Sequence, residues 1–139
     1  MIFQKEIVLK SRNKGFHLIT NEILSNLPEL KNYDKGICNL FLLHTSASLT
    51  INENCDPDVR SDLNKHFDKL APENQPYYDH TLEGSDDMPA HIKTSLTGVS
   101  LNIPIKNGNL ALGTWQGIYL CEHRYRGGNR KLLVTIIGE

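Results

Sequence analysis

The chain has 139 residues, a formal net charge of −1 and 22% charged residues, which fits a single domain over residues 1–139. A charge this close to zero argues against nucleic-acid binding through bulk electrostatics, so we expect no nucleic-acid partner. No apolar run approaches the roughly 20 residues that a bilayer-spanning helix needs, so we expect no membrane association.

The N-terminal residues predict a strand followed by a helix. Residues 1–10 mix apolar and charged positions, with the apolar ones on one parity, as in a half-exposed strand. Apolar side chains then recur with a 3.6-residue period over 16–27, which predicts an amphipathic helix. Pro28 is expected to end that helix.

Two strands and a second helix are predicted next. Gly36 opens an apolar run over 37–43, which is too short for a long helix and predicts a buried strand. Alternation at 49–51 predicts a further strand after a polar break. Asp56-Pro57 marks the start of a second helix, whose apolar face extends to Leu70, because proline is suited to the first helical turn.

Over residues 71–89 the apolar residues show no regular spacing. A loop of this length inside a compact domain is usually either functional or disordered. Tyr77 and Tyr78 favour order, because disordered segments are poor in aromatic residues. From Pro89 to about Leu96 the sequence predicts a short helix that Gly98 closes.

The C-terminal third predicts strands. Residues 99–103 alternate, 106–109 form a strong turn signal, and further apolar runs cover 110–112, 118–121 and 132–137. Helices in the first half and strands in the last third, without regular βαβ alternation, favour an α+β fold. We therefore predict a compact domain with a largely antiparallel or mixed sheet, two main helices and a long polar loop.

The cysteines and the first residues predict the compartment. Cys38, Cys55 and Cys121 are odd in number and contain no C-x-x-C pair, which argues against a disulfide framework. The segment Met1–Glu6 already contains charged side chains and lacks the apolar core of a signal peptide. We expect a cytoplasmic protein.

The first polar segment that suggests chemistry follows the apolar strand at 37–43. His44 is followed by small and hydroxyl residues, among them Ser46 and Ser48, which supply hydrogen-bond donors for an anion. The same pattern is equally explained as a polar connection between two strands.

A second polar segment leads into the predicted helix at Asp56. Asp56 suits the helix cap, whereas Asn52 and Glu53 are less easily explained by structure alone. Backbone N–H groups at the helix start are also suited to binding a phosphate. Each residue here is also compatible with a purely structural role.

The third segment is the most suggestive of a metal. His80 and His91 bracket three carboxylates, including Asp86 and Asp87, within twelve residues. Neighbouring like charges raise each other's pKa, so the cluster needs a cation, a histidine or water to offset it. Carboxylates suit Mg²⁺ and imidazoles suit Zn²⁺, whereas the alternative is a solvated acidic loop.

The fourth segment, 113–124, contains the only tryptophan. Trp115 lies between two glycines, as expected where backbone turns or approaches a ligand closely. If a strand runs from Ile118, His123 shares a face with Cys121, and Arg124 lies on the opposite face. The Arg124 guanidinium suits a phosphate, and it also suits an ion pair with Glu122.

Three motifs together resemble the YjbQ-like family, in the family's order and spacing and over nearly the whole chain. They are His44-Thr-Ser-Ala-Ser-Leu-Thr-Ile-Asn-Glu-Asn, Glu83-Gly-Ser-Asp-Asp-Met-Pro-Ala-His91 and Leu112-Gly-Thr-Trp-Gln-Gly-Ile-Tyr-Leu-Cys-Glu-His-Arg124. The resemblance implies an α+β fold assembled as a homotrimer, and a site with histidines matching His44, His91 and His123. It also implies weak activity as a secondary thiamine-phosphate synthase, which joins hydroxymethylpyrimidine diphosphate to thiazole phosphate.

Such a reaction requires stabilisation of the departing diphosphate, which a divalent metal such as Mg²⁺ or Zn²⁺ and positive side chains supply. We assign catalytic roles to His44, Glu53, His91 and His123. We assign ligand binding, with a phosphorylated small molecule as the ligand, to Ser46, Ser48, Asn52, Trp115 and Arg124. We assign metal binding to His44, His91, His123, Asp86 and Asp87.

Two other functions fit the same residues. In the first, the three histidines hold a metal that activates water, and the protein is a metal-dependent hydrolase. In the second, the protein is a trimeric binder of a small anionic ligand and performs no reaction. Absence of a bound transition metal would count against the hydrolase. Turnover of any bound ligand would count against the non-enzymatic binder.

Overall fold

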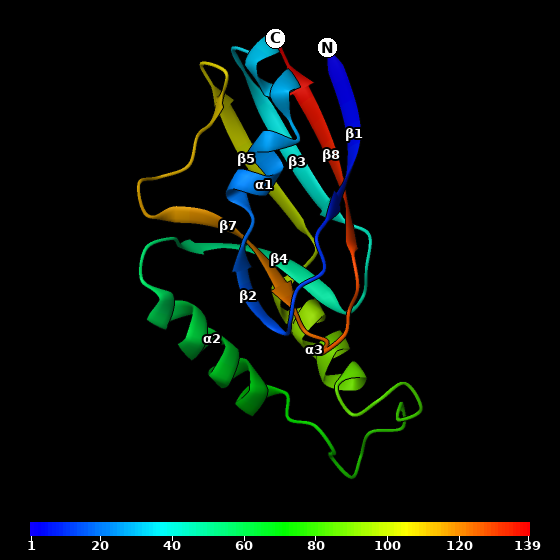
Figure 1. Cartoon of the computed structure of the whole chain (residues 1–139). Coiled ribbons are helices and arrows are strands. Elements are labelled where there is room, and N and C mark those ends of the chain that lie inside the picture. Colours follow the sequence, from blue (N-terminus) through cyan, green and yellow to red (C-terminus); the bar gives the residue numbers. More distant parts are fainter.

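A five-stranded antiparallel sheet forms one side of the molecule in the computed structural model, which describes residues 1–139 (Figure 1). Its strands lie in the order β1-β8-β3-β5-β6. They are β1 (Ile2–Leu9), β3 (Lys35–Leu42), β5 (Ser100–Lys106), β6 (Asn109–Leu110) and β8 (Arg130–Gly138). The β5–β6 turn contains Asn107 and Gly108, both with positive φ, as the Asn-Gly signal predicts.

A smaller antiparallel sheet has the order β2-β7-β4. Its strands are β2 (Gly15–Leu18), β4 (Ala47–Glu53) and β7 (Gln116–Glu122). The strand β7 is buried on both faces, because Ile118 and Leu120 belong to the main core whereas Tyr119 and Cys121 belong to a second cluster. This parity carries past the end of the strand and places Glu122 and His123 on opposite faces.

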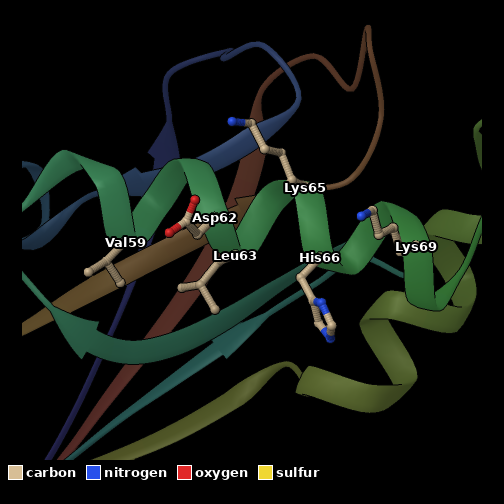
Figure 2. A pocket seen from close by; sticks show the side chains of 6 residues that line it. All are labelled: Val59, Asp62, Leu63, Lys65, His66 and Lys69. Atoms are coloured by element: carbon tan, nitrogen blue, oxygen red, sulfur yellow. The ribbon is translucent and has the colours of Figure 1, made fainter.

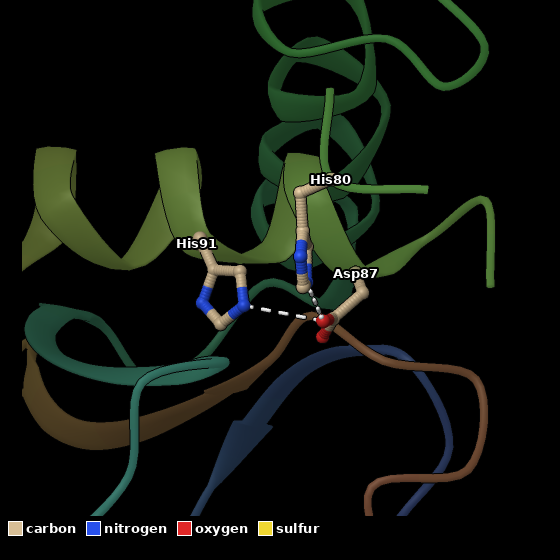
Figure 3. Close-up of side chains that lie close together, drawn as sticks. All are labelled: His80, Asp87 and His91. Atoms are coloured by element: carbon tan, nitrogen blue, oxygen red, sulfur yellow. Dashed lines mark hydrogen bonds and ion pairs between the residues drawn. The ribbon is translucent and has the colours of Figure 1, made fainter. Parts of the chain in front are cut away.

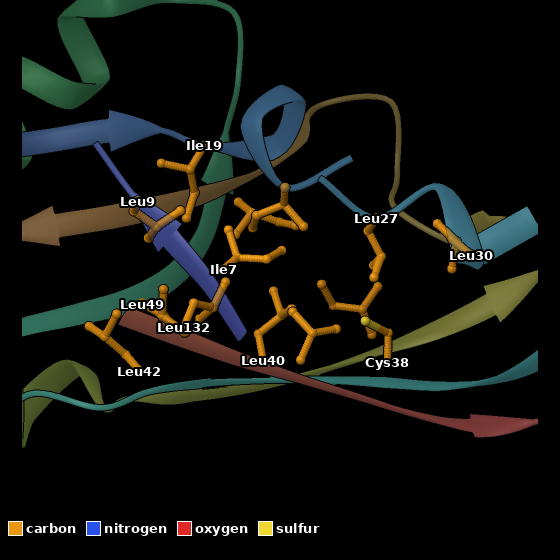
Figure 4. Close-up of a cluster of buried hydrophobic side chains, with 14 of the residues drawn as sticks. Ile7, Leu9, Ile19, Leu27, Leu30, Cys38, Leu40, Leu42, Leu49 and Leu132 are labelled. Atoms are coloured by element: carbon orange, nitrogen blue, oxygen red, sulfur yellow. The ribbon is translucent and has the colours of Figure 1, made fainter. Parts of the chain in front are cut away.

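Four helical segments complete the fold: α1 (Thr20–Ser25), the 3₁₀ helix η1 (Pro28–Asn32), α2 (Pro57–Leu70) and α3 (Asp87–Thr97). The main core lies between the inner face of the large sheet, α1 and one face of the small sheet (Figure 4). The other face of the small sheet packs against α2 and α3 (Figure 1). No helix is both long enough and apolar enough to cross a membrane.

The helix predicted over 16–27 is wrong in its first turn. Phe16 lies in β2 and pairs with Cys121 of β7, and its ring packs edge-on against Phe67 at 5.1 Å between centroids. The helix begins only at Thr20. Pairing with a strand about one hundred residues away therefore overrides the local helical period.

The other predicted elements are confirmed with small shifts of their ends. The cap of α2 is Asp56, whose side chain accepts a hydrogen bond from the N–H of Asp58. The helix α3 begins at Asp87, two residues before the expected start at Pro89. Residues 71–86 contain no helix or strand, so the expected long polar loop is present and leads directly into α3.

Candidate functional site

The first turn of α3 presents two carboxylates that Arg124 holds in place. Arg124 Nε donates to Asp86 Oδ2 at 3.0 Å, and its Nη1 donates to Asp87 Oδ1 at 2.7 Å. Its Nη2 donates to the carbonyl of Glu83 at 2.9 Å. All three nitrogens of the guanidinium thus have a partner inside the protein, so Arg124 supports the first turn of α3, and its phosphate-binding role stays a prediction. The alternative ion pair with Glu122 does not form, because the only group of Arg124 that donates to this carboxylate is its backbone N–H, at 3.1 Å.

Two imidazoles converge on the remaining oxygen of Asp87 (Figure 3). His80 Nε2 lies 2.7 Å from Asp87 Oδ2, and His91 Nε2 lies 3.2 Å from the same oxygen. His91 stands four residues after Asp87, so both side chains project from one face of α3. His80 reaches them from the 71–86 loop. One ligand atom from each of the three residues lies within 4.8 Å of the others.

The outer contacts of His91 and Asp87 orient the ligand atoms of these two residues toward each other. His91 Nδ1 lies 2.9 Å from the carbonyl oxygen of Thr45, which accepts only if Nδ1 carries the proton. The Nε2 lone pair of His91 therefore faces Asp87. Arg124 occupies Oδ1 of Asp87 and leaves Oδ2 toward the histidines. Such outer contacts are typical of metal-ligating histidines and carboxylates.

The electrostatics keep Asp87 ionised. Burial alone would raise the pKa of Asp87, but the hydrogen bond from His80 and the charge of Arg124 outweigh it and lower that pKa. Burial likewise opposes ionisation of Asp86, and the Tyr125 N–H and Arg124 outweigh it and lower the pKa of that carboxyl. Asp86 faces Arg124 and Tyr125 rather than the histidines, so its predicted role as a metal ligand is not supported.

The donor set of two imidazoles and one carboxylate suits Zn²⁺, Fe²⁺ or Mn²⁺ better than Mg²⁺, which prefers oxygen ligands. Three protein ligands leave coordination positions for water or substrate. An ion bound here would polarise a substrate oxygen or lower the pKa of a bound water. The residues present thus fit a catalytic rather than a closed structural metal site.

The three-histidine centre expected from the sequence does not form within the chain. His44 Nε2 accepts a hydrogen bond from the Lys131 N–H at 2.7 Å, so this lone pair is occupied. His123 is only 3% exposed, and its Nε2 lies 2.8 Å from Ser48 Oγ. His80, which the sequence assigned to the acidic loop but not to the site, is the partner of His91. The signal for it was its place at the other border of the same carboxylate cluster.

The remaining predicted site residues lie elsewhere. Glu53 is at the far end of β4, about 20 Å from Ala47 by strand length. Its carboxylate accepts from the N–H groups of Cys55 and Asp56 at 2.8 Å each, which orders the approach to α2. Asn52 Oδ1 accepts from the Glu53 N–H, and Trp115 is 62% exposed in the neighbouring loop. None of these three joins His91.

A buried ion pair joins β7, β8 and the loop after β3. Arg130 Nε and Nη2 donate to the two oxygens of Glu122 at 2.8 and 2.5 Å, and both residues are at most 4% exposed. Arg130 Nη1 also donates to Ser46 Oγ at 3.1 Å. A Cβ at Gly127 would lie 2.3 Å from Glu122 Oε1, so only glycine leaves room for this pair.

The Ser46 and Ser48 hydroxyls both have protein partners, so their predicted ligand-binding role is not supported here.

Two open cavities lie near the helices. One, of about 600 Å³, borders the metal-ligand cluster and includes His44, Thr45 and His91 in its wall. The other, of about 540 Å³, runs along α2, where Val59, Leu63 and His66 point to one side (Figure 2). The α2 cavity contains none of the residues that converge on Asp87.

The buried His123 predicts a pH dependence of stability. Burial, with Lys93 and Lys14 nearby, lowers the pKa of His123 from 6.5 to about 3. Between pH 6.5 and about pH 3 the unfolded chain binds a proton at His123 that the folded chain does not bind. The free energy of unfolding is therefore highest above pH 6.5 and falls as the pH falls, by at most about 1.4 kcal/mol per pH unit. Melting curves from about pH 7 to pH 5 should fall less steeply for the double variant Ser48→Ala/His123→Phe than for the natural sequence. If the melting temperatures of both proteins fell equally with pH, the assignment of this pH dependence to His123 would be contradicted.

Comparisons with known sequences identify a family. The family model described as UPF0047 protein YjbQ-like matches residues 5–139. The chain is 55% identical over 139 residues to the UPF0047 protein YjbQ of Salmonella typhimurium, with 100% of both chains covered. It is 46% identical over 136 residues to a UPF0047 protein of Synechocystis, with 98% of this chain and 92% of that protein covered.

Solved structures agree. An uncharacterized conserved protein of the YjbQ/UPF0047 family from Clostridium acetobutylicum superposes with a TM-score of 0.82 at 44% identity, covering 96% of this chain and 99% of that chain. A YbjQ-like protein of unknown function from Sulfolobus solfataricus gives a TM-score of 0.87 at 22% identity, covering 100% and 99%, which shows the fold alone. These descriptions name a family and a fold and assign no reaction.

Proposed function

The chain belongs to the YjbQ-like UPF0047 family, and on this premise we propose that it is a metal-dependent enzyme acting on a small anionic molecule. One observation carries the proposal: one ligand atom each of His80, Asp87 and His91 lies within 4.8 Å of the other two. This cluster borders a cavity of about 600 Å³, within the usual size range of small-molecule sites. A transition metal is favoured over Mg²⁺ by the two imidazoles.

Thr45 and Arg124 orient two of the three proposed metal ligands. The Thr45 carbonyl keeps the proton of His91 on Nδ1, so that Nε2 is the free donor. Arg124 holds Asp87 through Oδ1, so that Oδ2 is the oxygen available to a metal. A bound metal would supply a positive charge that stabilises a departing oxygen or activates a water.

The first candidate reaction is the thiamine-phosphate-synthase type, in which diphosphate leaves hydroxymethylpyrimidine diphosphate and the thiazole nitrogen attacks. The family resemblance supports this substrate pair. The second candidate is hydrolysis, in which water is the nucleophile. Hydrolysis is favoured by the engagement of Arg124 with Asp86 and Asp87, and of Arg130 with Glu122. Most N–H groups of these two guanidiniums thus already have a partner inside the protein, which leaves few of them for a second phosphorylated substrate.

Assembly as a homotrimer is part of the proposal. It is supported by apolar side chains on adjacent strands of the large sheet that one chain leaves exposed: Ile2 is 72%, Ile37 52% and Ile137 58% exposed. Burial of such side chains between copies would remove apolar surface from water.

Metal-loaded protein should release diphosphate from hydroxymethylpyrimidine diphosphate. We expect protein prepared without a histidine tag and stripped with a chelator to be inactive, and Zn²⁺, Mn²⁺ or Fe²⁺ to restore release. Thiamine phosphate should accumulate when thiazole phosphate is added if transfer is the reaction, and hydroxymethylpyrimidine alone if hydrolysis is. His91→Ala should abolish release, whereas His66→Ala, on the exposed surface of α2, should not. Binding of the substrate without turnover under every metal would favour a binding protein instead.

A further inference from the structure

The cavity next to His91 has a wall that contrasts with the charged centre beside it. The wall combines residues at the end of β3 and in the loop after it with the last turns of α3. It is lined by Phe41, Leu42, Leu43, His44, Thr45, His91, Thr94, Ser95, Gly98 and Val99. None of these is a lysine, arginine, aspartate or glutamate.

The first histidine in this wall, His44, is neutral near pH 7. Its Nε2 accepts a hydrogen bond from the Lys131 N–H, so this nitrogen carries no proton. Burial, with Arg130 close by, lowers the pKa of His44. Phe41 and Leu43 are both more than 40% exposed, and they present apolar surface to the cavity. The Arg124 charge nearby is neutralised outside the cavity by the carboxylates of the first turn of α3.

One polar atom in this wall lacks a partner. Thr94 is 7% exposed, and its Oγ1 is the only buried side-chain nitrogen or oxygen in the chain without a hydrogen bond. Leaving a buried hydroxyl unpaired destabilises the folded state, so such groups in natural proteins often mark a ligand or a functional constraint. A ligand with one acceptor or donor near α3 would satisfy it after a rotation of the side chain.

We infer that this cavity binds an uncharged ring of the substrate, while a single anionic group attached to that ring is held at the His80–Asp87–His91 centre; this rests on the proposed function. The substrate class is thus a ring compound with one anionic arm and at least one polar ring substituent. A substrate body that itself carries charge is disfavoured, because an ionised group would lose its water in a wall that offers it no counter-charge. An inorganic anion alone would leave the apolar wall empty.

Titration of the Zn²⁺-loaded protein with three probes tests the inference. Benzyl phosphate carries a ring and one anionic group, inorganic phosphate lacks the ring, and 3-phosphoglycerate has a charged body. We expect benzyl phosphate to bind at least about tenfold more tightly than inorganic phosphate, because its ring is taken out of water. We expect no gain for 3-phosphoglycerate. Equal affinity for all three would overturn the inference.

Two matched variants locate the ring. Ser95→Trp fills the cavity from the exposed surface of α3, and Leu96→Trp adds the same side chain at the next exposed position, outside the cavity. The preference for benzyl phosphate should vanish in Ser95→Trp and persist in Leu96→Trp, with Zn²⁺ affinity unchanged in both. A preference that survives Ser95→Trp would place the ring elsewhere and overturn the inference.

The failure of the proposed function is measured separately, by the metal content of the same samples. If no metal binds, the metal-free protein is titrated with benzyl alcohol, an uncharged ring without the anionic arm, and backbone amide NMR shifts are followed. Shifts confined to Thr94, Gly98 and Val99 support the ring site without the metal centre. Absence of such shifts overturns the ring site as well.

Discussion

Asp87→Asn should reduce the affinity for Zn²⁺ by more than about 100-fold, because it removes the only anionic ligand of the centre. The loss should exceed the roughly 10–100-fold that is typical when an outer contact of a metal ligand is removed. The substituted amide keeps the size of the natural side chain and one of its oxygens, so the effect reports charge rather than packing. Isothermal titration of chelator-treated protein measures the affinity, and the visible spectrum of Co²⁺-loaded protein reports the ligands.

Asp86→Asn is the matched control. Asp86 is the preceding residue and also accepts a hydrogen bond from Arg124, but it does not face His80 or His91. We expect Zn²⁺ affinity within about tenfold of the natural protein, since an outer contact alone is weakened. Equal losses in both variants would mean that the two carboxylates act only by charge, and would contradict a specific ligand role for Asp87.

Arg130→Met should destabilise the fold by about 3–5 kcal/mol, because it leaves the carboxylate of Glu122 buried without its counter-charge. Glu122 is 1% exposed, and its two oxygens both accept from Arg130. The free energy of unfolding from urea titration measures the change. Arg126→Met, which changes an exposed arginine two residues after Arg124, should have little effect.

The pH dependence of the Arg130→Met variant identifies the cause. Without Arg130, the carboxyl of Glu122 stays buried with no counter-charge, and burial penalises the charged form of a carboxyl. The folded state then binds more protons, so the deficit should shrink as the pH falls from about 7 to 5. The double variant Glu122→Leu/Arg130→Met should recover much of the stability, since replacement of both partners removes the unpaired charge. A deficit independent of pH would point to lost packing instead.

Local patterns were sufficient for most of the elements. Alternation of apolar residues predicted β3, β4 and β8, and the Asp56-Pro57 pair predicted the start of α2, which the structure confirms. The parity of β7 correctly placed His123 on the face of Cys121, where His123 packs against Phe16 and Phe67, because alternate strand residues share a face. These features depend on neighbours in the sequence, which is why the sequence alone revealed them.

The sequence also determined the family, through three motifs spread over nearly the whole chain, and it predicted a metal site at the carboxylate-rich segment before α3. It did not determine which side chains meet there. The sequence gives no reason to distinguish His44, His91 and His123. In the structure, a ring nitrogen of each one contacts a group far away in the chain: the Lys131 N–H, the Thr45 carbonyl and the Ser48 hydroxyl, respectively.

Only the tertiary structure decided two further points. Phe16 joins a strand rather than a helix because β2 pairs with β7, about one hundred residues later. Arg124 neutralises Asp86 and Asp87 rather than a ligand because the end of β7 lies beside the first turn of α3. Both outcomes depend on contacts between segments far apart in the chain, whose free energy exceeds the local preference of any single residue.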